Sequence, residues 1–360
     1  MFEQFDLQQL VAPLLDWYPS HARSLPWRDD PTPYHVWVSE IMLQQTRVEA
    51  VKPFYARFTE ALPDVYALAA CEEDRLLKLW EGLGYYNRVR NMQAAAQTIV
   101  REYGGRIPED YEELLKLKGI GHYTAAAITS IAYGHPAAAV DGNVLRIFMR
   151  ATENFSDIAK QSVQTAVRQA LQPVIPPEQA GLFTQATMEL GAIVCVPGGA
   201  PFCGQCPWER LCLAHAHGTE MSLPVKSRQK PRRIETKTVL IVRDGQRVLL
   251  QQRPKKGLLA GMYEPPGIEG AADERQIVDT LRQMGLSPIR LQRLPDAKHI
   301  FSHVEWHMHG YAVLVEEPET KGFLFVEPAA SEKKYAIPAA YAAYAQYMNI
   351  RIGQDKFLEE

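Results

Sequence analysis

Residues 195–212 read Cys195-Val-Pro-Gly-Gly-Ala-Pro-Phe-Cys203-Gly-Gln-Cys206-Pro-Trp-Glu-Arg-Leu-Cys212 and hold four of the five cysteines of the chain. Such crowding is typical of a ligand set for a soft metal centre. Disulfides are the alternative, but residues 1–20 have acidic side chains and no basic residue ahead of an apolar core, so nothing marks the chain as secreted. Structural zinc is a second alternative, although zinc sites usually have two C-x2-C pairs and this loop has one.

The bulk composition indicates a globular protein with room for more than one core. The chain has 360 residues, of which 46% are hydrophobic, and no apolar run approaches the roughly 18 residues of a membrane span. The net charge of -3 neither favours nor excludes nucleic acid, because local patches decide such binding. Closely grouped, reduced cysteines favour a cytoplasmic location.

A polar, basic segment divides the chain into two halves of different sequence pattern. Residues 217–233, HGTEMSLPVKSRQKPRR, are polar and basic, contain two prolines and lack an apolar period. Such a segment is typical of a linker, and its basic residues could equally lie along a phosphate backbone. We therefore expect a helical domain at 1–217, a linker at 218–234, a second domain at 235–350 and a tail at 351–360.

Apolar residues recur at helical spacing before the linker and alternate beyond it. The first half is predicted to be all-α, with helices at 36–58, 74–80, 91–103, 111–133, 144–151 and 178–194. In the second half, Asp244-Gly245 separates two β-rich runs, which is a strong hairpin signal. A further strand is expected at 300–315 and a helix at 338–348. This half is therefore predicted to be α+β.

The stretch Leu117-Lys-Gly-Ile-Gly-His-Tyr-Thr-Ala125 is a tight connection between two helices. Gly119 and Gly121 are expected to have positive φ and to leave free amides at the start of the helix near Tyr123. Amides at a helix N-terminus bind phosphate without regard to base sequence. An ordinary helix end followed by an ordinary helix start would use similar residues.

Two carboxyl groups of the first half have contrasting neighbours. Glu40 stands beside Trp37, Ile41 and Met42, which would desolvate it and raise its pKa, although a lone Glu on a helix is more often solvated. Asp141 lies in a polar turn, where it would stay ionised, and the ordinary role of such a residue is to cap the next helix. A neutral acid and an anion together can cleave a bond to an anomeric carbon.

The first half resembles the helix-hairpin-helix superfamily of DNA glycosylases and, within it, the MutY adenine DNA glycosylases. The matching stretches extend from about residue 20 to 215 and follow the order of the family. Each is weak alone, whereas the full set in this order is specific. They are Leu25-Pro-Trp-Arg28, Ser39–Thr46, Gly82–Tyr86, Gly119–Thr124, Asp141-Gly-Asn143, Glu189–Ala192 and the cysteine loop.

The resemblance implies a role for each matching residue. Glu40 would protonate N7 of an adenine swung out of the duplex, and Asp141 would stabilise the sugar cation electrostatically or covalently. Ordinary core packing is the alternative for the residues of the Gly82–Tyr86 stretch. The resemblance gives Tyr123 and Asn143 the role of assisting the two carboxyls, and it places Trp27, Arg28 and Gln185 in the base pocket. The residues that would line the duplex or wedge it open are Gln45, Thr46, Leu83 and Tyr85, of which Gln45 and Tyr85 would contact the opposite strand.

One position separates this family from endonuclease III. There the residue before the hairpin threonine is a lysine, which attacks the sugar as an amine and goes on to cut the strand. Here it is Tyr123, whose phenol cannot form a Schiff base. The resemblance therefore implies a monomeric, monofunctional glycosylase acting on duplex DNA with adenine opposite 8-oxoguanine or guanine. The alternatives are an endonuclease III-like glycosylase and lyase for oxidised pyrimidines, and a damage-binding protein without catalysis, which would need neither carboxylate.

The resemblance also assigns a [4Fe–4S] cluster to Cys195, Cys203, Cys206 and Cys212, with zinc as the rival. The first spacing in the family is usually six residues, and here seven intervene. The inserted loop holds two glycines and two prolines and is expected to absorb the extra residue.

The second half resembles the Nudix-fold domain with which this family recognises 8-oxoguanine, in the stretches 249–254, 261–267 and 301–303. The R-E-x-x-E-E helix that binds magnesium in Nudix hydrolases is missing, so nucleotide hydrolysis is not expected. Phe301, Ser302 and His303 are expected to approach the damaged base. His307 and His309 alternate with apolar residues, as on a half-exposed strand, rather than forming a metal site.

Overall fold

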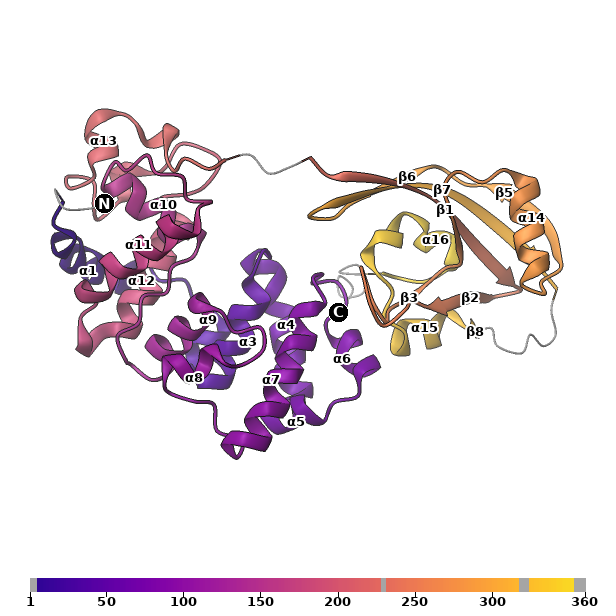
Figure 1. Cartoon of the computed structure of the whole chain (residues 1–360), viewed down its shortest axis with the longest axis horizontal. Helices are drawn as coiled ribbons and strands as arrows, with labels where there is room; N and C mark the ends of the chain where they lie inside the picture. Colours follow the sequence, from indigo (N-terminus) through magenta and orange to yellow (C-terminus); the bar gives the residue numbers. More distant parts are fainter. Residues whose placement is uncertain (1–4, 228–230, 317–323, 353–360) are drawn as a thin grey trace. The chain divides into compact units, whose positions relative to one another are not determined.

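The computed structural model of the chain describes residues 5–227, 231–316 and 324–352, and these form two compact units. The first unit is Met1–Ala70 with Arg90–Gln229, and the second is Cys71–Val89 with Lys230–Glu360 (Figure 1). Residues 71–89, which we had assigned to the helical domain, thus cluster with the C-terminal half. Positions 228–230 of the expected linker and 353–360 of the expected tail lie outside the described residues.

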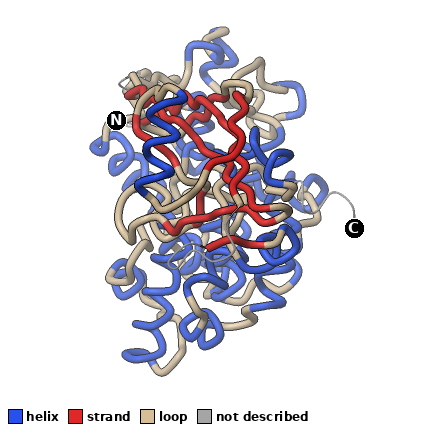
Figure 2. The backbone as a smooth tube through the Cα atoms, turned by 90° about the vertical axis from the view of Figure 1, so that its right-hand side faces the viewer, coloured by secondary structure: helices blue, strands red, loops and turns tan. Residues whose placement is uncertain are grey.

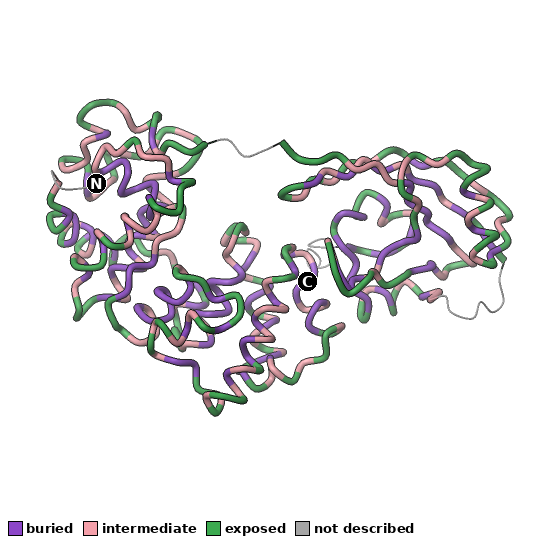
Figure 3. Tube along the Cα trace, viewed as in Figure 1, coloured by how far each residue is buried: buried purple, intermediate pink, exposed green. Residues whose placement is uncertain are grey.

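The first unit is built from helices, and its described residues contain no β-strand, which confirms the all-α prediction for this half. Its apolar periodicity gives helices with one buried face, as the alternation of buried and exposed turns in Figure 3 shows. The helices are α1 (Val11–His21), α2 (Pro26–Asp29), α3 (Pro33–Leu43), α4 (Val48–Ala61), α5 (Val65–Ala70), α7 (Asn87–Tyr103), α8 (Tyr111–Leu115), α9 (His122–Ala127), α10 (Gly142–Ala151), α11 (Gln161–Leu171), α12 (Ala180–Ile193) and α13 (Leu213–His217).

The single helix expected at 36–58 is wrong, because two helices stand there. Helix α3 ends at Leu43 and α4 begins at Val48, and between them Gln45 has a φ of 60°. A residue in the left-handed region cannot continue a right-handed helix. The apolar period continues across the break, so periodicity alone does not detect it.

The core of the first unit supports the cysteine loop. Trp208 of that loop is buried against Phe148 of α10, with ring centroids 5.3 Å apart, and its indole N–H donates to the carbonyl of Leu10 at 2.9 Å. The same cluster includes Leu190 of α12 and Leu14 of α1, which are fully buried. Helices α1, α10 and α12 therefore hold one end of the unit together around this loop.

The second unit is a mixed β-sheet with helices on both faces, which confirms the α+β prediction. Its main strand order is β3-β2-β1-β7-β5, with β4 beside β1, β6 beside β7 and β8 beside β2 (Figure 1). The strands are red in Figure 2. Helix α14 (Glu274–Gln283) covers one face, and α16 (Ala345–Met348) packs against the other. The strands are β1 (Arg233–Asp244), β2 (Arg247–Gln252), β3 (Tyr263–Glu264), β4 (Gly267–Glu269), β5 (Pro288–Arg293), β6 (Ala297–Ile300), β7 (Val304–Val315) and β8 (Leu324–Val326).

Two turns of the sheet refine the sequence expectations. The β1–β2 hairpin is confirmed, with Asp244 paired to Arg247, so that the two turn residues are Gly245 and Gln246. The strand expected at 300–315 is interrupted, because β6 ends at Ile300 and β7 begins at Val304. Residues 301–303 therefore form the β6–β7 turn instead of lying within a strand. No helix of the described residues is long and apolar enough to cross a membrane.

Candidate active site

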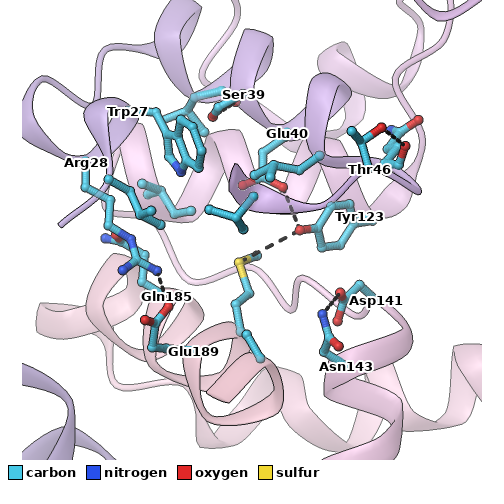
Figure 4. Close-up of a pocket in the computed structure, with 18 of the residues that line it drawn as sticks. Trp27, Arg28, Ser39, Glu40, Thr46, Tyr123, Asp141, Asn143, Gln185 and Glu189 are labelled. Atoms are coloured by element: carbon cyan, nitrogen blue, oxygen red, sulfur yellow. Dashed lines mark hydrogen bonds and ion pairs between the residues drawn. The ribbon is translucent and has the colours of Figure 1, made fainter. Parts of the chain in front are cut away.

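A cavity of about 580 Å³ lies within the first unit, and its size is typical of a pocket for a small ligand. Segments far apart in the sequence contribute to it: α2, α3, the Gln44–Val48 turn, α9, the start of α10, and α12 (Figure 4). Nine residues that the sequence singled out line this one cavity, namely Trp27, Arg28, Glu40, Gln45, Thr46, Tyr123, Asp141, Asn143 and Gln185.

Glu40 is a buried acid in the wall of the cavity. It lies on α3 with 6% of its surface exposed, next to fully buried residues of the same helix such as Trp37 and Met42. The Tyr123 hydroxyl of α9 donates to Glu40 Oε2 at 2.6 Å. Burial raises the pKa of Glu40 to about 7, although the Tyr123 hydrogen bond lowers it and the Asp141 charge adds to the rise. Near neutral pH the carboxyl therefore exchanges a proton with little driving force either way.

Asp141 is the N-cap of α10 and accepts two short hydrogen bonds. The Val144 N–H donates to its Oδ1 at 2.7 Å, and the Asn143 side-chain amide donates to its Oδ2 at 2.9 Å. Burial raises the pKa of Asp141, which is half-buried, and the predicted ionisation of its carboxyl stays a prediction. These donors and the Arg146 guanidinium oppose the rise because they stabilise the ionised form.

A buried ion pair fixes the side chain of Arg28 at the cavity. Glu189 of α12 is fully buried, and its carboxylate accepts from Arg28 Nη2 at 2.7 Å and from Arg23 Nε at 2.6 Å. Burial raises the pKa of Glu189, but the hydrogen bonds from both guanidinium groups outweigh it and leave the pKa below its ordinary value. Arg23, Met188 and Glu189 also line the cavity, although no role was predicted for them from the sequence. Glu189 stands one helical turn after Gln185, and this spacing is the sequence signal that could have placed it at the cavity.

The remaining lining side chains suit a planar, polar-edged ligand. The Trp27 ring packs edge-on against Tyr55, with centroids 5.5 Å apart, and is a largely buried part of the cavity wall. The amide of Gln185 accepts from the Tyr18 hydroxyl at 3.4 Å. An aromatic ring, a guanidinium and an amide can stack on and hydrogen-bond a heterocyclic base.

The helix-hairpin-helix connection lies between α8 and α9. Gly119 has a φ of +82°, and a Cβ there would come within 2.6 Å of Asn91 Cβ, so both backbone and space require glycine. Gly121 has an extended conformation, φ −99° and ψ 179°, and the positive φ expected for it is wrong. Neither glycine lines the cavity, and phosphate binding here stays a prediction.

The four cysteines of the loop are half-buried and line one small cavity together with Trp208 and Arg150. Arg150 donates to Cys195 Sγ at 3.2 Å. Arg146 donates to the Cys195 carbonyl at 2.7 Å and to the Asn143 side-chain oxygen at 2.9 Å, which joins the loop to the Asp141 turn.

The sulfur spacing tests which metal group fits these cysteines. One zinc ion with Zn–S bonds of about 2.3 Å brings its sulfurs to about 3.8 Å from one another. Among the described residues, the three ligand atoms that all lie within 4.8 Å of one another belong to Cys203, His215 and Glu220, and no three cysteine sulfurs do. A cluster that binds each thiolate through a different iron needs a wider spacing, so the donor set fits it better than a single ion.

In the second unit the structure brings together two residues that the sequence assigned to DNA recognition. The Ser302 hydroxyl of the β6–β7 turn donates to the Tyr85 hydroxyl at 3.0 Å. Tyr85 is 47% exposed and has a φ of 49°, whereas Leu83 is buried as a packing residue. Phe301 packs edge-on against Trp306 at 4.8 Å, and His303 is exposed. The cavity of the first unit is lined by none of the five residues that the sequence assigned to DNA recognition here, namely Leu83, Tyr85, Phe301, Ser302 and His303.

Comparisons with known proteins match both units. The family described as "HhH-GPD superfamily base excision DNA repair protein" matches residues 38–173, and the NUDIX domain matches residues 238–347. "Adenine DNA glycosylase" of Mus musculus is 34% identical over 370 residues, covering 87% of this chain and 72% of that protein. The protein of the same name from Buchnera aphidicola subsp. Baizongia pistaciae is 28% identical and covers 84% and 86%.

Solved structures agree for the helical unit. A trapped endonuclease III–DNA covalent intermediate has a TM-score of 0.51 and 26% identity, and the match covers 59% of this chain and 99% of that one. A thermostable thymine-DNA glycosylase has a TM-score of 0.52 at 26% identity, covering 58% and 97%.

Proposed function

This chain belongs to the adenine DNA glycosylases, which are base-excision-repair enzymes that bind duplex DNA, and we propose that it removes adenine paired with 8-oxoguanine or guanine and leaves the strand intact. The observation that carries the proposal is the pair of carboxyls at one cavity, a buried Glu40 whose pKa is about 7 and an Asp141 surrounded by donors.

The proposed reaction begins when an adenine leaves the base stack and enters the cavity. Glu40 gives its proton to N7 of the base, so that the base departs as a neutral molecule. The bond from C1′ to N9 breaks toward an oxocarbenium ion, which the Asp141 carboxylate stabilises. Water then adds to C1′ and leaves an abasic site.

A purely hydrolytic outcome is supported by the side chains of the cavity. A lyase needs an amine to form a Schiff base with the sugar. The described residues that line the cavity include no lysine, and burial raises the pKa of Tyr123 well above its ordinary value, so its hydroxyl stays neutral. We therefore infer that the abasic product is released with its phosphodiester bonds intact.

Recognition of 8-oxoguanine is supported by the second unit. Tyr85 and Ser302 come from distant parts of the sequence, and their hydroxyls meet at 3.0 Å on exposed turns. Two adjoining hydroxyl groups can donate to and accept from the edge of a purine that carries both a carbonyl and an N–H. We propose that they contact the base opposite the adenine, with Phe301 and His303 beside them.

The test is a duplex assay with adenine opposite 8-oxoguanine, opposite guanine and opposite thymine. We expect adenine to be released from the first two duplexes, and strand breakage only after alkali treatment. Breakage without alkali, or excision of an oxidised pyrimidine instead, would favour the endonuclease III-like alternative. Tight binding without base release would make the chain a damage-binding protein. Size-exclusion chromatography and cell fractionation would test the proposed monomer and its cytoplasmic location.

We also propose that the four loop cysteines hold a [4Fe–4S] cluster, which would brace the loop that packs on α10. Burial raises the pKa of the Cys203 thiol to about 11 and that of Cys206 to about 12, and a bound metal centre would favour their thiolate forms. We expect the purified protein to be brown, to absorb at about 400 nm and to contain four irons per chain. A colourless protein with one zinc per chain would overturn this assignment.

A further inference from the structure

The segment Cys71–Val89 clusters with the second unit, although the residues before and after it in the sequence belong to the first unit. We propose that Lys78 and Glu81 are positioning residues that hold Tyr85 against Ser302 and thereby set the preference for the base opposite the adenine. The inference rests on the proposed function, because it concerns how that opposite base is selected.

Lys78 connects this segment to a helix in the C-terminal part of the second unit by hydrogen bonds. It lies near the end of α6 (Glu73–Leu79), and its ammonium donates to the carbonyls of Tyr335 at 2.7 Å and Ser331 at 3.3 Å. These carbonyls lie at the C-terminal end of α15 (Pro328–Lys334), where the helix dipole is negative. The Ser331 carbonyl also accepts the Tyr335 N–H at 3.1 Å, so the ammonium adds a second donor at this helix end.

Glu81 makes the second half of the connection. Its carboxylate is 3% exposed, pairs with the Lys78 ammonium at 2.8 Å and accepts the backbone N–H of Ile337 at 2.9 Å. Ile337 is itself a fully buried core residue of the unit. One carboxylate thus joins the segment to both the neighbouring cation and the backbone of the core.

An outer contact extends the same interface. The Tyr263 hydroxyl of β3 donates to Asp74 Oδ2 at 3.2 Å, and its backbone N–H donates to the Ala336 carbonyl at 2.9 Å. Polar groups along α6 therefore meet residues 331–337 and β3 over its whole length. Buried ionic contacts of this kind can fix one register where apolar packing would accept several.

The loop from Glu81 to Tyr85 is held by its backbone conformation and by contacts with neighbouring side chains. It has positive φ at Gly82, Gly84 and Tyr85, so its path is set by backbone conformation as well as contacts. The fully buried Trp80 donates from its indole to the Gly84 carbonyl at 3.0 Å. Arg88 donates to the Gly84 carbonyl at 3.2 Å and lies over the Tyr85 ring, 5.4 Å from its centroid.

The consequence is that one rigid path connects α15, Lys78, Glu81 and the exposed Tyr85 hydroxyl. Ser302 reaches the same hydroxyl from the other side through the β6–β7 turn. If the α6 contacts loosen, the Tyr85 and Ser302 hydroxyls separate, and discrimination between two purines that differ in their edge groups falls. The chemistry at Glu40 and Asp141 uses none of these residues.

The experiment compares Lys78→Met with wild type in single-turnover base release from duplexes with adenine opposite 8-oxoguanine and opposite guanine. We expect the apparent second-order rate constant for the 8-oxoguanine duplex, divided by that for the guanine duplex, to fall about tenfold, because small displacements of positioning groups have effects of this order. The rate constant at saturating enzyme on the guanine duplex should stay within about twofold of wild type. Lys78→Arg keeps a cation at the α15 carbonyls and should restore the ratio.

Lys52→Met is the matched control, because Lys52 forms an exposed pair with Glu49 at the same i,i+3 spacing on α4, at 2.9 Å. It should leave the ratio unchanged. Amide hydrogen exchange supplies a second readout, and residues 331–337 should lose protection in Lys78→Met and keep it in Lys52→Met.

The outcomes separate this inference from the function on which it rests. A wild-type protein that releases no adenine from either duplex would overturn the proposed function, whereas a wild type that releases adenine equally from both would overturn the positioning role. A preference that survives Lys78→Met, or equal losses on both duplexes, would overturn the positioning role alone.

Discussion

Glu40→Gln is expected to reduce the rate of adenine release by about 10³-fold, the order of magnitude that a general acid contributes. The substitution keeps the shape of the side chain and its hydrogen bond to the Tyr123 hydroxyl, 2.6 Å in the wild type, but it removes the proton that N7 must receive. Affinity for the mismatched duplex should change little. The measurements are single-turnover glycosylase kinetics and a binding titration on the same duplex.

The pH profile distinguishes loss of an acid from a general disturbance of the cavity. In the wild type the protonated form of Glu40 is depleted as the pH rises through about 7, so base release should decline over that range. The Tyr123 hydrogen bond lowers the pKa of Glu40, and Tyr123→Phe should therefore move the decline to higher pH. Normal adenine release by Glu40→Gln would rule out its role as the acid.

The raised pKa of Glu40 also makes the stability of the folded protein depend on pH. Glu40 binds its proton more tightly in the folded protein than its ordinary value of 4.5 implies, so the native state holds more protons between about pH 4.5 and 7. Wild-type stability therefore falls as the pH rises across this window, by up to about 3 kcal/mol. Glu40→Gln lacks this dependence and should gain in melting temperature relative to wild type as the pH rises.

Asp141→Asn is expected to slow base release by about 10²- to 10³-fold, because it removes the carboxylate proposed to stabilise the developing sugar cation. Asparagine is as good an N-cap as aspartate, so α10 should still begin at Gly142, with the Val144 N–H donating to the side-chain oxygen of residue 141. The expected signature is a large loss in rate with an unchanged circular dichroism spectrum and melting temperature.

Asp273→Asn provides the control for this substitution. Asp273 also caps a helix, α14, through a hydrogen bond from the Gln276 N–H at 2.8 Å, but it lies in the second unit and away from the cavity. Its replacement should leave the glycosylase rate unchanged. If the two substitutions slow the reaction equally, the effect of Asp141→Asn comes from the helix cap and the electrostatic role is wrong.

Sequence alone predicted the class of both halves because their signals are local and repeated. The 3.6-residue period before the linker and the Asp244-Gly245 hairpin beyond it each lie within a short window. The break at Gln45 was missed because a single residue with positive φ leaves the apolar period intact. The assignment of 71–89 to the second unit depends on contacts such as Lys78 with Tyr335, which no local pattern reveals.

The sequence predicted those site residues that stand in known motifs. Glu40, Tyr123 and Asp141 were identified by their motifs, and their convergence on one cavity could only be seen in three dimensions. The rise in the pKa of Asp141 was not predicted because a sequence shows that a turn is polar but does not show how far folding buries it. Glu189 was overlooked because its partners, Arg23 and Arg28, are distant in the sequence.

The split composition of the second unit limits how its specificity could be moved to another enzyme. A graft of residues 230–360 onto a different glycosylase would carry Ser302 but lack α6 and Tyr85. The donated module would present a bare surface at residues 331–337 where Lys78 and Glu81 had been. A chimera that is to keep the contact between Tyr85 and Ser302 therefore needs both pieces of the sequence.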